Sequence, residues 1–178
     1  FIKVSIGLYM KVENLRDMAR LRKGCAYRNL ERPYTRKSKY KKLSFVRATP
    51  SNKIVRYEGG NLTKKFPFCV DLISRASIQM RHNAIESARL SANRYLEKNL
   101  GKQAFRLQIR LFPHHILREN PLASGAGADR MSTGMKKSFG RDIGIASQIK
   151  KGKELFEVKV DKKNIDKAKE SLSRASKR

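Results

Sequence analysis

The sequence is poor in cysteine, in acidic residues and in long apolar runs, and it has no tryptophan. Its two cysteines, Cys25 and Cys69, have no CxxC spacing and no matching histidine cluster, which argues against a disulfide framework or a zinc site. We therefore expect reduced cytosolic thiols and no bound metal. No apolar run approaches the roughly 20 residues needed to span a bilayer. We expect a soluble protein without a membrane partner.

The shortage of acidic residues leaves a large positive charge. Lysine and arginine number 42 and aspartate and glutamate 15, so the formal net charge is 42 − 15 = +27. An excess of this size repels itself and is costly to compact without counter-charge. The expected partner is therefore a polyanion, and nucleic acid is the natural one. The 178 residues suffice for one domain with a single core.

The positive charge is concentrated between Arg20 and Arg56, where thirteen basic residues accompany a single acid, Glu31. Prolines and a glycine pair interrupt any long helix in this part of the chain. We therefore predict a basic, mostly extended RNA-binding segment over residues 19–64, preceded by an extension of uncertain status over residues 1–18.

Four tyrosines lie in or next to this basic stretch: Tyr27, Tyr34, Tyr40 and Tyr57. Such rings either stack on unpaired bases or anchor a small core, and the sequence leaves both interpretations open.

From Lys65 onward, periodicity predicts a globular α+β domain over residues 65–178, with an antiparallel or mixed β-sheet and two packed helices. In chain order we predict a strand at 66–72, a helix begun by Ser74 or Ser77 and ended by Gly101, and a strand at 103–112. A strand around 143–149 follows, and a turn at 150–153 closes a hairpin between it and a strand at 156–160. The last predicted element is a helix capped by Asp161 or Asn164. Arg106 and Arg110 make the second face of the 103–112 strand basic.

Residues 113–141 have no helical or strand period over most of their length, and we predict a long glycine-rich loop there. Four glycines allow positive φ or a close approach of the backbone to another molecule. Small residues dominate its centre, while cations such as Arg118 and Arg130 surround it. This composition again indicates a polyanionic neighbour.

Several separate motifs also carry a resemblance to a known family. They are TRKSKY (35–40), RHNAIESARLSANRYLEKNLG (81–101), HHILREN (114–120), SGAGADR (124–130), TGMKKSFG (133–140) and VDKKNIDKAKESLSRAS (160–176). In this order they resemble the universal large-subunit ribosomal protein family called sixteen in bacteria and ten-e in archaea and eukaryotes, in its archaeal form. The resemblance extends from about Ala19 to the end of the sequence.

The resemblance implies a cytoplasmic ribosomal protein, a structural constituent of the large subunit. Its globular domain would bind rRNA near the site of aminoacyl-tRNA accommodation, and its long loop would point toward the peptidyl transferase centre. The implied partners are large-subunit rRNA, tRNA and neighbouring ribosomal proteins, with no homo-oligomer and no cofactor. The rRNA-binding candidates are Arg20, Arg22, Lys23, Arg28, Arg32, Arg36, Lys37, Lys39, Lys41, Lys42, Arg47, Arg56, Arg81, Arg89 and Arg118. The candidates in the tRNA-proximal loop are Ser124, Gly125, Gly127, Asp129 and Arg130.

Two alternatives come from other functional classes. A basic RNA chaperone would act in subunit assembly without remaining bound, and an RNA-modifying enzyme would use the glycine-rich loop for a phosphate-bearing cofactor. The loop lacks the GxxxxGK[ST] spacing of a P-loop, and the adjacent His114 and His115 are expected to diverge, so we predict no catalytic site.

Overall fold

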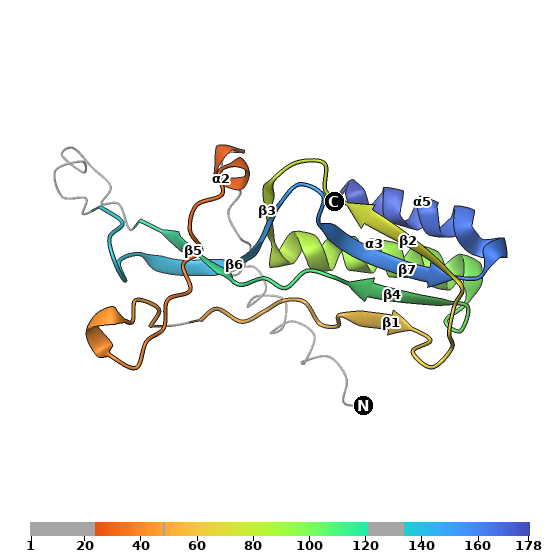
Figure 1. The fold of residues 1–178 in the computed structure, drawn as a ribbon, viewed down its shortest axis with the longest axis horizontal. Coiled ribbons are helices and arrows are strands. Elements are labelled where there is room, and N and C mark those ends of the chain that lie inside the picture. Colours follow the sequence, from red (N-terminus) through yellow and green to blue (C-terminus); the bar gives the residue numbers. More distant parts are fainter. Residues whose placement is uncertain (1–23, 48, 121–133) are drawn as a thin grey trace, which may run out of the picture.

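The computed structural model describes residues 24–47, 49–120 and 134–178, and it has the predicted α+β class (Figure 1). A four-stranded sheet has the order β1-β4-β7-β2, a three-stranded sheet has the order β3-β6-β5, and every strand pair is antiparallel. The strands are β1 (Glu58–Gly60), β2 (Phe68–Ile73), β3 (Ile78–Arg81), β4 (Phe105–Ile109), β5 (His115–Glu119), β6 (Arg141–Ile149) and β7 (Glu154–Val160). The helices are α2 (Cys25–Arg28), α3 (His82–Leu100) and α5 (Ile165–Ser176), with 3-10 turns η1 (Lys41–Leu43) and η2 (Lys162–Asn164).

The two sheets are the two ends of one bent ribbon. Ile73 pairs with Glu154 at the end of the first sheet, and Ile78 pairs with Ile149 at the start of the second. The chain therefore advances five residues from β2 to β3 (78 − 73 = 5) and five from β6 to β7 (154 − 149 = 5). The pairing register is thus the same on both sides of the bend. Ser74 closes the bend by donating its N–H to the carbonyl of Lys153 at 3.0 Å and accepting the N–H of Gly152 at 2.9 Å.

This geometry corrects the predicted hairpin. The 150–153 turn does not fold β7 back onto β6; it bends the chain from one sheet into the other, and β7 pairs with β2 and β4 instead. The alternation of apolar residues identified both strands correctly, but it carries no information about the partner of each strand.

The main core lies between the four-stranded sheet and the two long helices, which cover one of its faces (Figure 1). Phe105, Leu107, Phe156 and Val158 supply the sheet side, and the helix side comes from the predicted stripes: Ile85, Ala88, Ala92 and Leu96 on α3, and Ala168, Leu172 and Ala175 on α5. The two helices also pack on each other, and the Ser171 hydroxyl donates to the Ala92 carbonyl at 3.2 Å.

Two predicted element boundaries are wrong. The segment expected to open the first helix forms β3 instead, so α3 begins at His82 and neither Ser74 nor Ser77 caps it. Gly101 ends α3 as predicted, with φ of +75°. The last helix begins after Asn164, but the Asn164 side chain forms no capping hydrogen bond.

Strand β5 lies inside the predicted 113–141 loop. The sequence did not indicate this strand, because its two buried apolar residues, Ile116 and Leu117, are too few to show a period.

A second, small cluster holds the basic segment on the three-stranded sheet. Val46 packs with Ile116 of β5 and Ile145 of β6, and Tyr34 lies against them. The part of the basic segment between Tyr34 and Val46 is therefore attached to the three-stranded sheet, whereas β1, near the end of the segment, pairs with β4 in the four-stranded sheet (Figure 1). None of the helices in the described ranges 24–47, 49–120 and 134–178 is long and apolar enough to cross a membrane.

Candidate nucleic-acid interface

The basic segment exposes most of its predicted RNA-binding cations. Arg28, Arg32, Arg36, Lys37, Lys39, Lys41, Lys42, Arg47 and Arg56 are all exposed. Within the described part of the chain, no ion pair is formed by any of these nine side chains. Their charges are therefore available to an external anion. The candidates Arg20, Arg22 and Lys23 lie outside the described residues.

A backbone loop between Arg36 and Val46 carries the densest group of these cations. The N–H groups of Phe45 and Val46 both donate to the Arg36 carbonyl, at 3.1 and 3.2 Å, which closes the loop at its base. The Tyr34 hydroxyl donates to the Phe45 carbonyl and ties the loop to the sheet. Since η1 forms the tip region of this loop, Lys41 and Lys42 project from a fixed turn rather than from a free chain.

Tyr34 is the anchor between the basic segment and β5. Its backbone N–H donates to Nδ1 of His115 at 2.8 Å, and its carbonyl accepts the N–H of Ile116 at 3.4 Å. The Arg118 guanidinium lies 3.7 Å from the centre of the Tyr34 ring and donates to the carbonyls of Lys137 and Phe139 at 2.9 and 2.6 Å. The ring contact and these two carbonyl hydrogen bonds thus hold Arg118 over the tyrosine.

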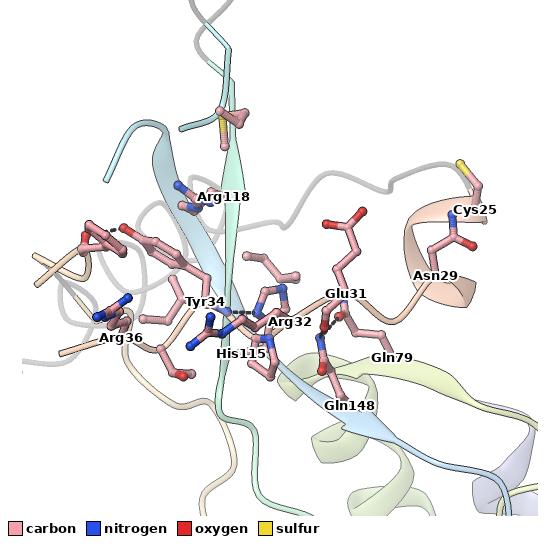
Figure 2. A pocket seen from close by; sticks show the side chains of 16 residues that line it. Cys25, Asn29, Glu31, Arg32, Tyr34, Arg36, Gln79, His115, Arg118 and Gln148 are labelled. Carbon is pink, nitrogen blue, oxygen red and sulfur yellow. Dashed lines mark hydrogen bonds between the residues drawn. The ribbon is translucent and has the colours of Figure 1, made fainter. Parts of the chain in front are cut away.

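A cavity of about 530 Å³ opens beside this anchor, between the basic segment and strands β3, β5 and β6 (Figure 2). We call it the arginine pocket. Arg32, Arg36 and Arg118 line it, together with Tyr34, Phe45, Gln79, Gln148 and nine other residues that include Glu31 and His115. Glu31 is its only acidic lining residue, so the pocket favours an anion.

The tyrosines divide between the two roles that the sequence left open. Tyr34 is a packing anchor, as its place in the small cluster shows. Tyr57 is half-buried, stacks on the exposed Phe112 with ring centroids 5.9 Å apart, and accepts a hydrogen bond from Asn52 at 2.6 Å. Tyr40 is 61% exposed next to Lys39 and is the ring most open to an external base.

Two predicted rRNA-binding arginines do not present a free charge on the surface. Arg81 is only 7% exposed at the start of α3. Arg89 forms two hydrogen bonds with the Glu86 carboxylate, at 2.8 and 2.5 Å, and this pairing raises the pKa of Arg89. We therefore restrict the proposed RNA contacts to the exposed cations and Arg118.

The outer face of the four-stranded sheet is charge-balanced rather than basic, contrary to the prediction for the 103–112 strand. Arg106 pairs with Glu58 at 3.1 Å, and Arg110 pairs with Glu154 and Glu157, both at 3.4 Å. Acidic residues on the neighbouring strands β1 and β7 thus compensate the arginines of β4. Sequence alternation showed which residues share a face of one strand but not which residues face them across the sheet.

Cys69, Asp71 and Glu157 form a cluster on this face, with ligand atoms within 4.8 Å of one another. Burial works to raise the pKa of Glu157, but the Lys159 ammonium at 2.8 Å, the Cys69 thiol and Arg110 outweigh it and lower that pKa. Burial, the hydrogen bond to Asp71 and the two carboxylates raise the pKa of Cys69 to about 12. A metal that bound through Cys69 would first have to displace the proton of this thiol.

The two histidines of the predicted loop do not converge. His115 accepts the Tyr34 N–H, whereas His114 is exposed, with Nδ1 3.2 Å from the Phe112 carbonyl. The predicted tRNA-proximal residues Ser124, Gly125, Gly127, Asp129 and Arg130 lie outside the described residues. Sequence analysis missed Gln79 and Gln148 as pocket residues, since neutral amides on two separate strands give no recognisable spacing.

The family model described as ribosomal protein L16p/L10e matches residues 31–178. The large ribosomal subunit protein uL16 of Methanococcus aeolicus is 43% identical over 157 residues, which cover 88% of this chain and 87% of the relative. The proteins of the same name from Methanoculleus marisnigri and Archaeoglobus fulgidus are 43% and 39% identical, over 83% and 84% of this chain and 84% and 83% of the respective relatives.

Proposed function

Since the chain belongs to the L16p/L10e family of ribosomal proteins, we propose that it is a structural constituent of the large subunit of the cytoplasmic ribosome and holds rRNA through its basic segment. Members of this family are structural proteins, and the chain is not an enzyme. Neighbouring ribosomal proteins are its other partners in the subunit.

The observation that carries this proposal is the arrangement of charge. The nine exposed cations of the basic segment have no acidic partner within the described residues, whereas the arginines on the outer sheet face are neutralised. A chain of net charge +27 needs an external polyanion, and the basic segment presents exposed arginines and lysines in high density without an acidic partner among the described residues. The rRNA phosphates supply that counter-charge.

Sedimentation of tagged protein with large subunits tests the proposal. We expect the protein to remain with the subunit through a wash in high salt, because contacts buried within a folded RNA are screened much less than exposed ones. A protein that leaves mature subunits and accompanies only precursors would instead be an assembly chaperone.

We further propose that the segment around Ser124–Arg130 reaches toward the tRNA acceptor end and the peptidyl transferase centre. The family resemblance supports this, and so does the fold: Glu119 and Arg141 pair at the end of the β5–β6 ladder. Glu119 and Arg141, on either side of this segment, therefore lie at one end of the three-stranded sheet. Tyr34 and Val46 of the basic segment pack on the same sheet, so both parts of the chain would face the same RNA.

Replacement of residues 121–133 by a glycine-serine linker of equal length tests this second proposal. We expect large subunits that contain the variant to bind aminoacyl-tRNA more weakly, while the thermal unfolding midpoint of the isolated protein is nearly unchanged. Arg130→Ala should weaken tRNA binding in the same direction by removing a charge-assisted contact. Normal tRNA binding and growth with the linker would show that this segment is only a connector.

A further inference from the structure

The arginine pocket offers two planar surfaces. One is the Arg118 guanidinium over Tyr34, at 3.7 Å from the ring centre, and the other is the Arg36 guanidinium over Phe45, at 5.4 Å. Because the Tyr34 hydroxyl donates to the Phe45 carbonyl, the two stacked pairs are tied together at fixed positions. Aromatic rings and guanidinium planes are the surfaces on which proteins stack unpaired RNA bases.

The inner wall of the pocket is polar and ordered. Nε2 of Gln148 donates to the Glu31 carbonyl at 2.9 Å and to Oε1 of Gln79 at 3.3 Å, which fixes both amides (Figure 2). Within the described residues, Oε1 of Gln148 and Nε2 of Gln79 have no further hydrogen-bond partner. The two amides thus leave one acceptor and one donor in the wall of the pocket, and the edge of a nucleobase can meet such groups.

The mouth of the pocket is cationic. Arg32 and Arg36 are exposed, and neither forms an ion pair with any described residue. The volume of about 530 Å³ lies within the range of small-ligand sites, roughly 300–1,000 Å³. The pocket therefore combines planes for a base, amides for its edge and guanidinium groups for its phosphate.

We propose that the arginine pocket receives one unpaired nucleotide, flipped out of the bound RNA, with its base against the guanidinium–aromatic pairs and its edge on Gln79 and Gln148. This rests on the proposed function, since the nucleotide belongs to rRNA. It adds a base-reading site to an interface that otherwise contacts phosphates. Phosphate contacts set position, whereas a captured base sets the register of the protein on the RNA.

Titration of the full chain with mononucleotides at low salt tests the pocket by itself. The probes are AMP, GMP, CMP and UMP, with ribose 5-phosphate as the base-free control and NMR shifts as the measurement. We expect at least one nucleotide to bind at least tenfold more tightly than ribose 5-phosphate. Gln148→Ala should abolish that preference, and Lys163→Ala, which changes an exposed cation on η2, should leave it unchanged. Equal binding of nucleotides and ribose 5-phosphate would reduce the pocket to an anion site and overturn the proposal.

Chemical probing of rRNA in large subunits provides the second measurement. In subunits with the unaltered protein we expect one unpaired base to be protected, and in subunits with Gln148→Ala the same base should become reactive at equal protein content. Unchanged reactivity at equal content would overturn the pocket proposal. If the unaltered protein fails to enter large subunits at all, the proposed function fails, and the mononucleotide titration still decides whether the pocket binds a base.

Discussion

Ile85 lies in the middle of α3, fully buried against the core that Phe105 and Leu107 form on the sheet. Truncation of such a side chain removes its transfer free energy and leaves a cavity, so Ile85→Ala should lower the free energy of unfolding by about 2–5 kcal/mol. Leu90 lies on the same helix but is 53% exposed, so Leu90→Ala should cost less than about 0.5 kcal/mol. Urea unfolding of both variants measures the difference. Equal losses would mean that α3 packs through another face.

Cys69 is exposed, but neighbouring groups lower the reactivity of its thiol by raising the thiol pKa. Burial of part of its surface, Asp71 and Glu157 together raise the pKa of its thiol to about 12. Since only the thiolate reacts, the alkylation rate of Cys69 by iodoacetamide in a Cys25→Ser background should still rise above pH 11, whereas an ordinary thiol would level there. Asp71→Asn should move the rise to lower pH. A half-maximal rate near pH 9 with Asp71 in place would contradict this electrostatic account.

Gly60 shows how one element depends on a missing side chain. It ends β1 with φ of +83°, and a Cβ there would lie 2.2 Å from the Phe105 carbonyl oxygen of β4. Gly101 has a similar φ of +75° at the end of α3, but a Cβ there would meet nothing within 4 Å. Gly101→Ala should therefore cost only the strain of the positive φ, about 1–2 kcal/mol, whereas Gly60→Ala should cost more, because the β1–β4 pair must also separate. Thermal unfolding of the two variants compares the costs, and equal losses would exclude the clash.

The sequence predicted well the elements whose apolar residues recur at regular spacing and pack against one core. Both helix stripes and the strands now assigned as β2, β4, β6 and β7 alternate or repeat against the same apolar interior. The elements it missed, β1, β3 and β5, are three to five residues long, too short for a period, and are held by pairing with a neighbour. The bend at 150–153 was predicted as a hairpin because apolar periodicity identifies a strand but not the strand that pairs with it. The pairing partner depends on the arrangement of the whole sheet.

Charge is distributed unevenly over the whole molecule. The described cations of the basic segment are mostly exposed, and thirteen basic residues with one acid cannot be neutralised locally. Alternation along the chain did not indicate that the arginines of β4 and Arg89 form ion pairs, or that Arg81 is buried. Their environment depends on Glu58, Glu86 and Glu157, or on burial, and only the fold brings these together. The arginine pocket was likewise invisible, because three separate strands and the basic segment build it.

This uneven distribution of charge predicts that cations of the basic segment contribute to the salt dependence of RNA binding, whereas the paired arginines of the four-stranded sheet do not. If six to ten phosphates are contacted, the affinity of the free protein for isolated large-subunit rRNA, outside the assembled subunit, should fall by roughly 10³–10⁵ between about 50 and 200 mM salt. Lys41→Gln with Lys42→Gln removes two exposed charges from η1, and the slope of log affinity against log salt should become shallower by about 0.9 for each lost contact. Arg106→Gln with Arg110→Gln removes the same number of charges from the balanced sheet face and should leave that slope unchanged.

Because the second pair also leaves Glu58 and Glu157 without their partners, both proteins are first checked by thermal unfolding, and binding is measured well below the lower midpoint. A shallower slope for the sheet-face variant would mean that RNA lies on the four-stranded sheet as well, and that the ion pairs there open to admit phosphate.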